Sequence, residues 1–114
     1  MGGEQMKVVE GEDAIVILIT VASREEAERI ARRLVEDRLA ACVNIVPQVR
    51  SLFIWQGKFS QEDEILLVVK SRRARFRELA TAVKQLHSYS VPEIIALPIL
   101  LGSSDYLRWV AEST

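Results

Sequence analysis

His87, Glu64 and Glu93 are the best candidates in this chain for binding a metal ion or moving a proton. A neutral imidazole nitrogen is a good ligand for Cu²⁺ or Zn²⁺, and carboxylates add oxygen ligands. A third alternative, behind metal binding and ligand sensing, is a small enzyme that uses His87 and Glu93 as acid and base. A structural alternative stays open for each residue, because a histidine at a helix end can bond the last carbonyls and a glutamate can pair with an arginine.

Counts of the other reactive residues narrow the classes of function. The 114 residues include one cysteine, Cys42, and one histidine, so an internal disulfide framework, a zinc finger and a di-histidine metal site are excluded. Cys42 lies in an apolar segment, and we interpret it as a small buried residue. The net charge of −1 argues against nucleic-acid binding through phosphate contacts. The apolar run Ala14–Ile19 is far shorter than the ~20 residues that span a bilayer.

Two hydrophobic periodicities predict the elements that position these residues. Runs rich in Val and Ile indicate strands, and apolar residues at helical spacing indicate helices. Ser23 is predicted to cap the first helix, and Pro47 predicts an edge position or a bulge in a long strand. The expected elements are a strand at 14–21 buried on both faces, a helix from 24 to about 38, a hairpin at 40–70 turning at 56–58, a helix at 72–86, a strand at 93–100 and a short final helix.

This order, β-α-β-β-α-β, predicts an α+β, ferredoxin-like sandwich. Right-handed crossovers give a four-stranded antiparallel sheet in order 4-1-3-2, with two helices on one face. We expect a single domain at 14–114 after a flexible leader at 1–13. The topology brings Glu64, Glu93 and the loop with His87 to one rim of the sheet, and puts Cys42 and Lys70 at the other rim.

Several runs resemble the CutA (divalent-cation tolerance) family. They are Leu39-Ala40-Ala41-Cys42-Val43-Asn44 with Pro47, Ser51-Leu52-Phe53-Ile54-Trp55-Gln56-Gly57-Lys58, Glu64 with Lys70, His87-Ser88-Tyr89-Ser90-Val91-Pro92-Glu93-Ile94, and Gly102 with Tyr106-Leu107 and Trp109. The resemblance implies a tight homotrimer similar in assembly to the PII signalling proteins. It also implies binding of divalent metal, copper especially. Ile19 and Leu86 stand where bacterial members with a copper site have a cysteine and a second histidine, and Ser88 and Ser90 also depart from the family pattern.

The residues and the resemblance together lead us to expect a non-enzymatic, cytoplasmic protein that requires no cofactor. As the resemblance implies, it would be a trimer that binds a divalent metal, weakly and through His87, Glu64 and Glu93. The alternative is a PII-like sensor or adaptor whose inter-subunit clefts hold a small anion or a partner peptide. Lys70, Tyr89 and Trp55 would line that cleft. We also expect exposed aromatic residues such as Trp55 to anchor an interface between subunits. Nucleic acid and membrane are not expected partners.

Overall fold

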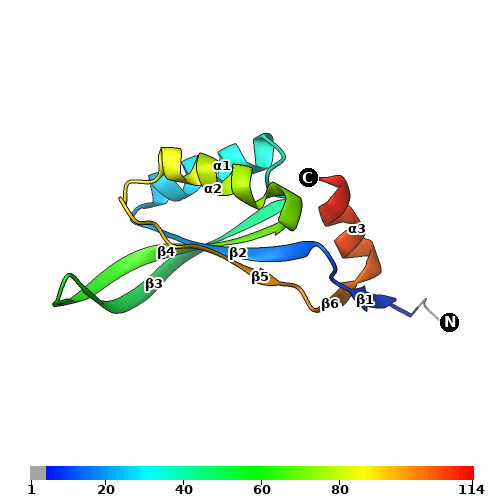
Figure 1. Ribbon diagram of the computed structural model, residues 1–114, viewed down its shortest axis with the longest axis horizontal. Coiled ribbons are helices and arrows are strands. Elements are labelled where there is room, and N and C mark those ends of the chain that lie inside the picture. The colour runs from blue at the N-terminus through cyan, green and yellow to red at the C-terminus, as the bar shows by residue number, and fades with distance from the viewer. Residues whose placement is uncertain (1–4) are drawn as a thin grey trace.

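A four-stranded antiparallel sheet forms the body of the molecule, as a computed structural model describing residues 5–114 shows. Its strands lie in the order β3-β4-β2-β5, and α1 and α2 cover one face (Figure 1). The elements are β1 (Val8–Glu10), β2 (Ala14–Val21), α1 (Arg24–Glu36), β3 (Cys42–Trp55), β4 (Lys58–Arg72), a 3₁₀ turn (Arg73–Arg75), α2 (Phe76–Leu86), β5 (Ile94–Pro98), β6 (Leu101–Ser103) and α3 (Ser104–Glu112). The predicted α+β, ferredoxin-like class and strand order are confirmed.

The core lies between the two helices and the covered face of the sheet. Ile17 and Ile19 of β2 meet Ile30 and Leu34 of α1 there, and all four are fully buried. The other face of β2 is only half-buried, because α1 and α2 lie on the opposite face of the sheet (Figure 1). The prediction that β2 is buried on both faces is therefore wrong for the single chain. Its apolar sequence nevertheless leaves an open, apolar sheet face.

The β3–β4 hairpin extends beyond the helices and is the longest feature of the fold (Figure 1). β3 is an edge strand, and its register with β4 shifts between Val46 and Val49, around Pro47. Both the edge position and the bulge predicted for Pro47 are present. Gln56 and Gly57 form the turn with φ of 50° and 81°, the two positive values that suit the right-handed twist of a hairpin.

The N-terminal region departs from the predicted flexible leader. Val8–Glu10 form β1, which pairs antiparallel with Leu101–Ser103, and the Gly11 amide donates to the Leu100 carbonyl at 3.0 Å. The prediction of a flexible leader is therefore wrong for these residues. The sequence did not indicate β1, because the strand is only three residues long and its partner lies over ninety positions away. Residues 1–4 lie outside the described part of the chain.

α3, β1 and β6 lie together at the end of the molecule opposite the hairpin (Figure 1). The predicted final helix is present, and the Ser103 hydroxyl caps it by accepting from the Tyr106 amide at 3.2 Å. No helix within residues 5–114 has both the length and the apolar character needed to cross a membrane.

Candidate functional site

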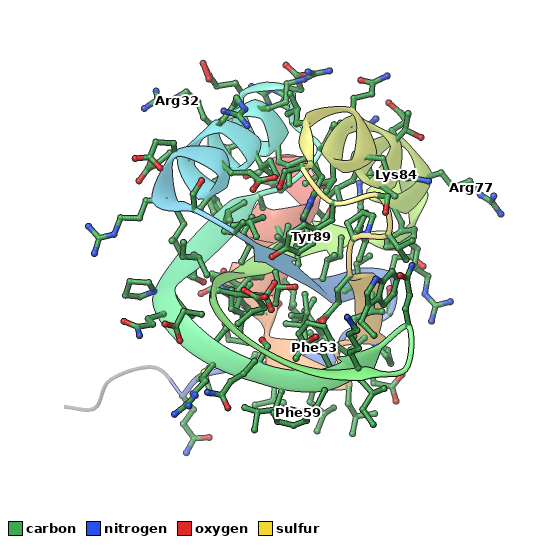
Figure 2. The ribbon with its side chains drawn as sticks, turned by 90° about the vertical axis from the view of Figure 1, so that its left-hand side faces the viewer. Arg32, Phe53, Phe59, Arg77, Lys84 and Tyr89 are labelled. Atoms are coloured by element: carbon green, nitrogen blue, oxygen red, sulfur yellow. The ribbon has the colours of Figure 1, made fainter. Side chains whose placement is uncertain are left out.

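The hairpin end of the sheet carries an open cleft of about 750 Å³. The cleft is lined by residues from β2, both hairpin strands and the loop after α2, including Trp55, Glu62, Glu64, Tyr89 and Glu93. Figure 2 looks at the molecule from this end and shows Tyr89 and Phe53 within the curve of the hairpin, while Phe59 points outward. We call this feature the rim cleft.

Strand register explains why these side chains share the cleft. Ser51 lies opposite Glu62, and Val49 lies opposite Glu64, so each pair projects from the same face of the hairpin. Glu93 immediately precedes β5, whose first residue, Ile94, pairs with Ile19 of β2. The sheet therefore brings carboxylates from two segments to one hollow.

Glu64 forms the floor of the rim cleft and is only 7% exposed. Its Oε2 accepts a hydrogen bond of 2.8 Å from the Tyr89 hydroxyl. Burial raises the pKa of Tyr89, and the hydrogen bond to Glu64 with the charges of Glu64, Glu62 and Glu26 raises it further. Tyr89 therefore stays protonated as a donor in a region of negative potential.

His87 lies behind this cleft, and its side chain is completely buried. One ring nitrogen, Nε2, lies 2.8 Å from the Thr20 carbonyl, and the other, Nδ1, accepts from the Tyr89 amide at 3.0 Å. Because a carbonyl only accepts and an amide N–H only donates, the proton belongs on Nε2. Neither nitrogen is free to bind a metal.

The predicted metal set of His87, Glu64 and Glu93 is therefore not assembled in this chain. His87 does not line the rim cleft. Across residues 5–114, no three His, Cys, Asp or Glu side chains are grouped so that they could hold a metal ion. The physical reason is that the histidine completes a packed loop behind the sheet, whereas the two glutamates face the hollow in front of it.

The spacing of Ser23 and Glu26 is typical of a capping box with a favourable charge in the first turn of α1, but it does not indicate the larger role of Glu26. The Ser23 hydroxyl caps the helix by accepting from the Glu26 amide at 3.2 Å, as predicted. The Glu26 carboxylate, however, accepts from the Ala22 amide at 3.3 Å and from the Ser88 amide and hydroxyl at 2.6 and 3.0 Å. It thus fixes the loop that carries His87 and Tyr89.

These bonds decide the charge of Glu26, which is 4% exposed. Burial alone would raise its pKa, but the amide and hydroxyl of Ser88 and the amide of Ala22 outweigh burial and hold the pKa below the ordinary value of about 4.5. A capping-box glutamate three residues after Ser23 was the only signal in the sequence, and it gave no hint of the distant Ser88.

The predicted ligand cleft of Lys70, Tyr89 and Trp55 is split between the two ends of the sheet. Tyr89 and Trp55 line the rim cleft. Lys70 lies at the other end, opposite Cys42, where its ammonium group donates to the Asn44 side-chain oxygen. The separation of Cys42 and Lys70 from the His87 loop agrees with the topology expected from the sequence.

Comparison with known proteins identifies the family. The family model described as CutA1 divalent ion tolerance protein matches residues 15–113. The chain belongs to the CutA1 family. The resemblance led us to compare two positions, 19 and 86, with the cysteine and second histidine of a copper site. In this chain Ile19 is fully buried in the core, and Leu86 is partly buried and packs against the core.

Relatives of the CutA1 family match most of the chain. The divalent-cation tolerance protein CutA of Thermus thermophilus is 54% identical over 99 residues, covering 87% of this chain and 96% of that protein. The chloroplastic CutA protein of Arabidopsis thaliana is 45% identical over 101 residues, covering 89% of this chain and 56% of that longer protein. The name of the Thermus thermophilus protein describes tolerance of divalent cations, and neither name gives an enzymatic activity.

Solved structures share the fold closely. The Cut A1 structure from Thermus thermophilus has a TM-score of 0.87 at 52% identity and covers 89% of this chain and 98% of that one. A CutA structure from Archaeoglobus fulgidus, described as a periplasmic divalent cation tolerance protein, has a TM-score of 0.85 at 46% identity and covers 88% and 97%.

Proposed function

We propose that this chain acts in divalent-cation tolerance as a non-enzymatic protein that binds divalent cations weakly in the rim cleft. The observation that carries the proposal is that Glu62, Glu64 and Glu93 line one hollow. Within residues 5–114 they are not grouped as a three-ligand site, so the cation would keep most of its water. None of the three forms an ion pair with a basic side chain of residues 5–114. Three carboxylates without a countercharge attract a cation.

The donor set defines the kind of binding. With His87 enclosed, the ligands are carboxylate oxygens and water, which favours weak and rather unselective binding. Cu²⁺ remains the tightest of the divalent first-row ions, because it leads the affinity order at most nitrogen and oxygen sites. Zn²⁺ follows it.

Titration calorimetry with Cu²⁺ and Zn²⁺ tests the proposal. The double variant Glu64→Gln/Glu93→Gln keeps the shape of both side chains and removes both charges, so we expect at least a tenfold loss of affinity. Asp63→Asn is the matched control, because Asp63 neighbours Glu64 on β4, is exposed and does not line the cleft. Unchanged affinity in the double variant, or equal losses in the control, would contradict the proposal.

We also propose that the chain forms a homotrimer through its open sheet face. Val16 and Leu18 of β2 lie on this face, beside Leu97 and Ile95 of β5, and the two β5 residues are exposed in the single chain. Full burial of such a side chain from water contributes about 1.5–3 kcal/mol, and covering the exposed half of each β5 residue contributes part of that. Light scattering should give three times the 12.9 kDa chain mass at both low and high salt. Leu97→Glu should lower that mass, while Glu28→Lys on the exposed side of α1 should not.

The cytoplasm is the proposed location, because the single cysteine, Cys42, is free. Fractionation of cells expressing the tagged chain tests this, and recovery from a periplasmic or organellar fraction would contradict it. A PII-like anion site is less well supported than a cation site. The rim cleft carries three glutamates, and Lys70 lies at the far end of the sheet.

A further inference from the structure

The single histidine of the chain connects α1, β2 and the loop after α2. The side chain of His87 is completely buried. Its Nε2–H donates to the Thr20 carbonyl at 2.8 Å, and its Nδ1 accepts from the Tyr89 amide at 3.0 Å. The Tyr89 ring lies beside the imidazole, with 4.8 Å between the ring centroids. The neutral imidazole thus uses one nitrogen as a donor and the other as an acceptor, and the acceptor holds the backbone of Tyr89.

Glu26 on α1 offers the imidazole a second partner. Its Oε2 lies 3.5 Å from Nδ1 of His87, and it is the one ion-pair partner of the ring within residues 5–114. Burial alone would raise the pKa of Glu26, but its hydrogen bonds to Ser88 and Ala22 hold that pKa below 4.5. The carboxylate is therefore ionised at neutral pH. Nδ1 thus has two neighbours of opposite kind, an amide that only donates and a carboxylate that only accepts.

Tyr89 links the imidazole to the sheet. Its hydroxyl donates to Oε2 of Glu64 on β4 at 2.8 Å, and it lies in the negative potential of Glu64, Glu62 and Glu26. From β2, the Thr20 carbonyl faces the imidazole and does not titrate. The charged groups that face the His87 and Tyr89 pair are therefore all acidic, Glu26 from α1 and the two glutamates from β4.

Protonation of the ring reverses the role of Nδ1. An imidazolium carries a hydrogen on both nitrogens, so Nδ1 can no longer accept from the Tyr89 amide. The Glu26 carboxylate attracts the imidazolium, and so does the C-terminal end of α2, where His87 is the cap residue. Burial opposes the charge. Oε2 of Glu26 already accepts from the Ser88 amide at 2.6 Å, but a carboxylate oxygen can accept twice, so Ser88 stays anchored while Tyr89 loses its acceptor.

We propose that His87 is a pH-sensitive latch for Tyr89. The neutral ring holds the Tyr89 amide, and the Tyr89 hydroxyl then donates to Glu64. When Nδ1 takes up a proton from solvent, the imidazolium pairs with Glu26, the Tyr89 amide is released and the hydroxyl leaves Glu64. All of these groups belong to one chain, so the latch does not depend on what covers the rim cleft. It also needs no bound cation.

Nuclear magnetic resonance on the full chain tests the latch directly. Because the chain has one histidine, ¹⁵N labelling of histidine gives the ring signals of His87 alone. Labelling tyrosine at the amide nitrogen and at the ring carbon that bears the hydroxyl gives two sets of signals, and Tyr89→Phe assigns the ring carbon of Tyr89 by removing its signal. Histidine ordinarily changes charge between about pH 8 and pH 5. Across that range we expect the His87 ring and both Tyr89 signals to shift with one common midpoint.

Two variants identify the source of the Tyr89 shift. His87→Gln keeps an amide that can donate and accept but cannot become charged, so we expect loss of the pH-dependent shift of Tyr89. Glu64→Gln removes the titratable group that the Tyr89 hydroxyl contacts, and the shift of the Tyr89 amide should remain. Far-ultraviolet circular dichroism verifies the fold at each pH. The titration of the natural chain is decisive even if His87→Gln does not fold.

Three results would overturn the latch. The first is a His87 ring that stays neutral down to about pH 5 in the folded chain. The second is a ring that titrates while the Tyr89 signals stay fixed. The third is a Tyr89 shift that persists in folded His87→Gln or disappears in Glu64→Gln. Titration calorimetry with Cu²⁺ and Zn²⁺ measures the proposed cation site separately, so failure of either proposal leaves the other intact.

Discussion

Ser88 and Tyr89 are consecutive residues, and each serves a buried glutamate. Ser88 donates its amide and its hydroxyl to Glu26, which also receives the Ala22 amide. Tyr89 donates one hydroxyl to Glu64. The Glu26 carboxylate is buried behind the sheet and accepts from three donors. Glu64, in contrast, lines the rim cleft together with Glu62.

The difference shows how two buried carboxylates can have opposite roles. A carboxylate whose oxygens are occupied by fixed donors is a structural element, and removing it leaves those donors unpaired. A carboxylate with one donor and no countercharge keeps capacity for a ligand, at a cost in stability. Burial alone does not distinguish these cases, but the number of hydrogen bonds does.

Glu26→Gln should have the largest effect on the free energy of unfolding. The amide replaces one acceptor oxygen with a donor, which then faces the Ser88 or Ala22 amide. We expect a loss of about 2–4 kcal/mol in the free energy of unfolding, measured by urea denaturation at pH 7. Glu25→Gln, one residue earlier on the exposed side of α1, should change stability by less than about 0.5 kcal/mol. Equal effects of the two substitutions would contradict the structural role of Glu26.

The hydrogen bonds to Glu26 should also make the free energy of unfolding depend on pH. Because the folded chain holds the pKa of Glu26 below its ordinary value of about 4.5, the unfolded chain binds more protons between those two values. This contribution is complete above pH 4.5 and is lost as the pH falls through the folded pKa. The stability gap between the natural chain and Glu26→Gln should therefore narrow below about pH 4.5 in urea titrations. A stability difference that stays constant down to about pH 3, a unit or more below the ordinary carboxyl pKa, would contradict this pH dependence.

Glu64→Gln should have the smallest effect on the free energy of unfolding, and it should stabilise the protein rather than destabilise it. The substitution removes a charge that repels Glu62 and Glu93, while the amide oxygen can still accept from Tyr89. We expect unfolding free energy to stay the same or rise by up to about 1 kcal/mol at pH 7. Asp63→Asn provides the exposed reference. A loss comparable with that of Glu26→Gln would show that Glu64 is structural as well.

Local patterns predicted most of the fold because each element is specified by nearby residues. Ser23 and its cap, Pro47 and its bulge, and the Gln56-Gly57 turn are all readable over a few positions. β1 could not be read in this way, since three residues carry too little periodicity and their partner, β6, lies at the other end of the chain.

The site was predictable in place but not in chemistry. Topology indicated that Glu64, Glu93 and the His87 loop share a rim, and the structure places them there. It could not indicate that His87 would bond the Thr20 carbonyl, 67 positions away, or that Glu26 would meet Ser88 across 62 positions. Residue type suggests what a side chain can bind, and only tertiary packing decides what it does bind.

Pro47 and its bulge have a further consequence for the behaviour of the chain before it finds a partner. β3 is a 14-residue edge strand, and a long regular edge is a template for open-ended strand stacking and aggregation. Pro47 has no N–H to offer an incoming strand, and the shifted register between Val46 and Val49 interrupts the regular ladder beside it. We therefore expect the free edge to resist fibre growth, which would leave newly made chains available for the homotrimer that we propose.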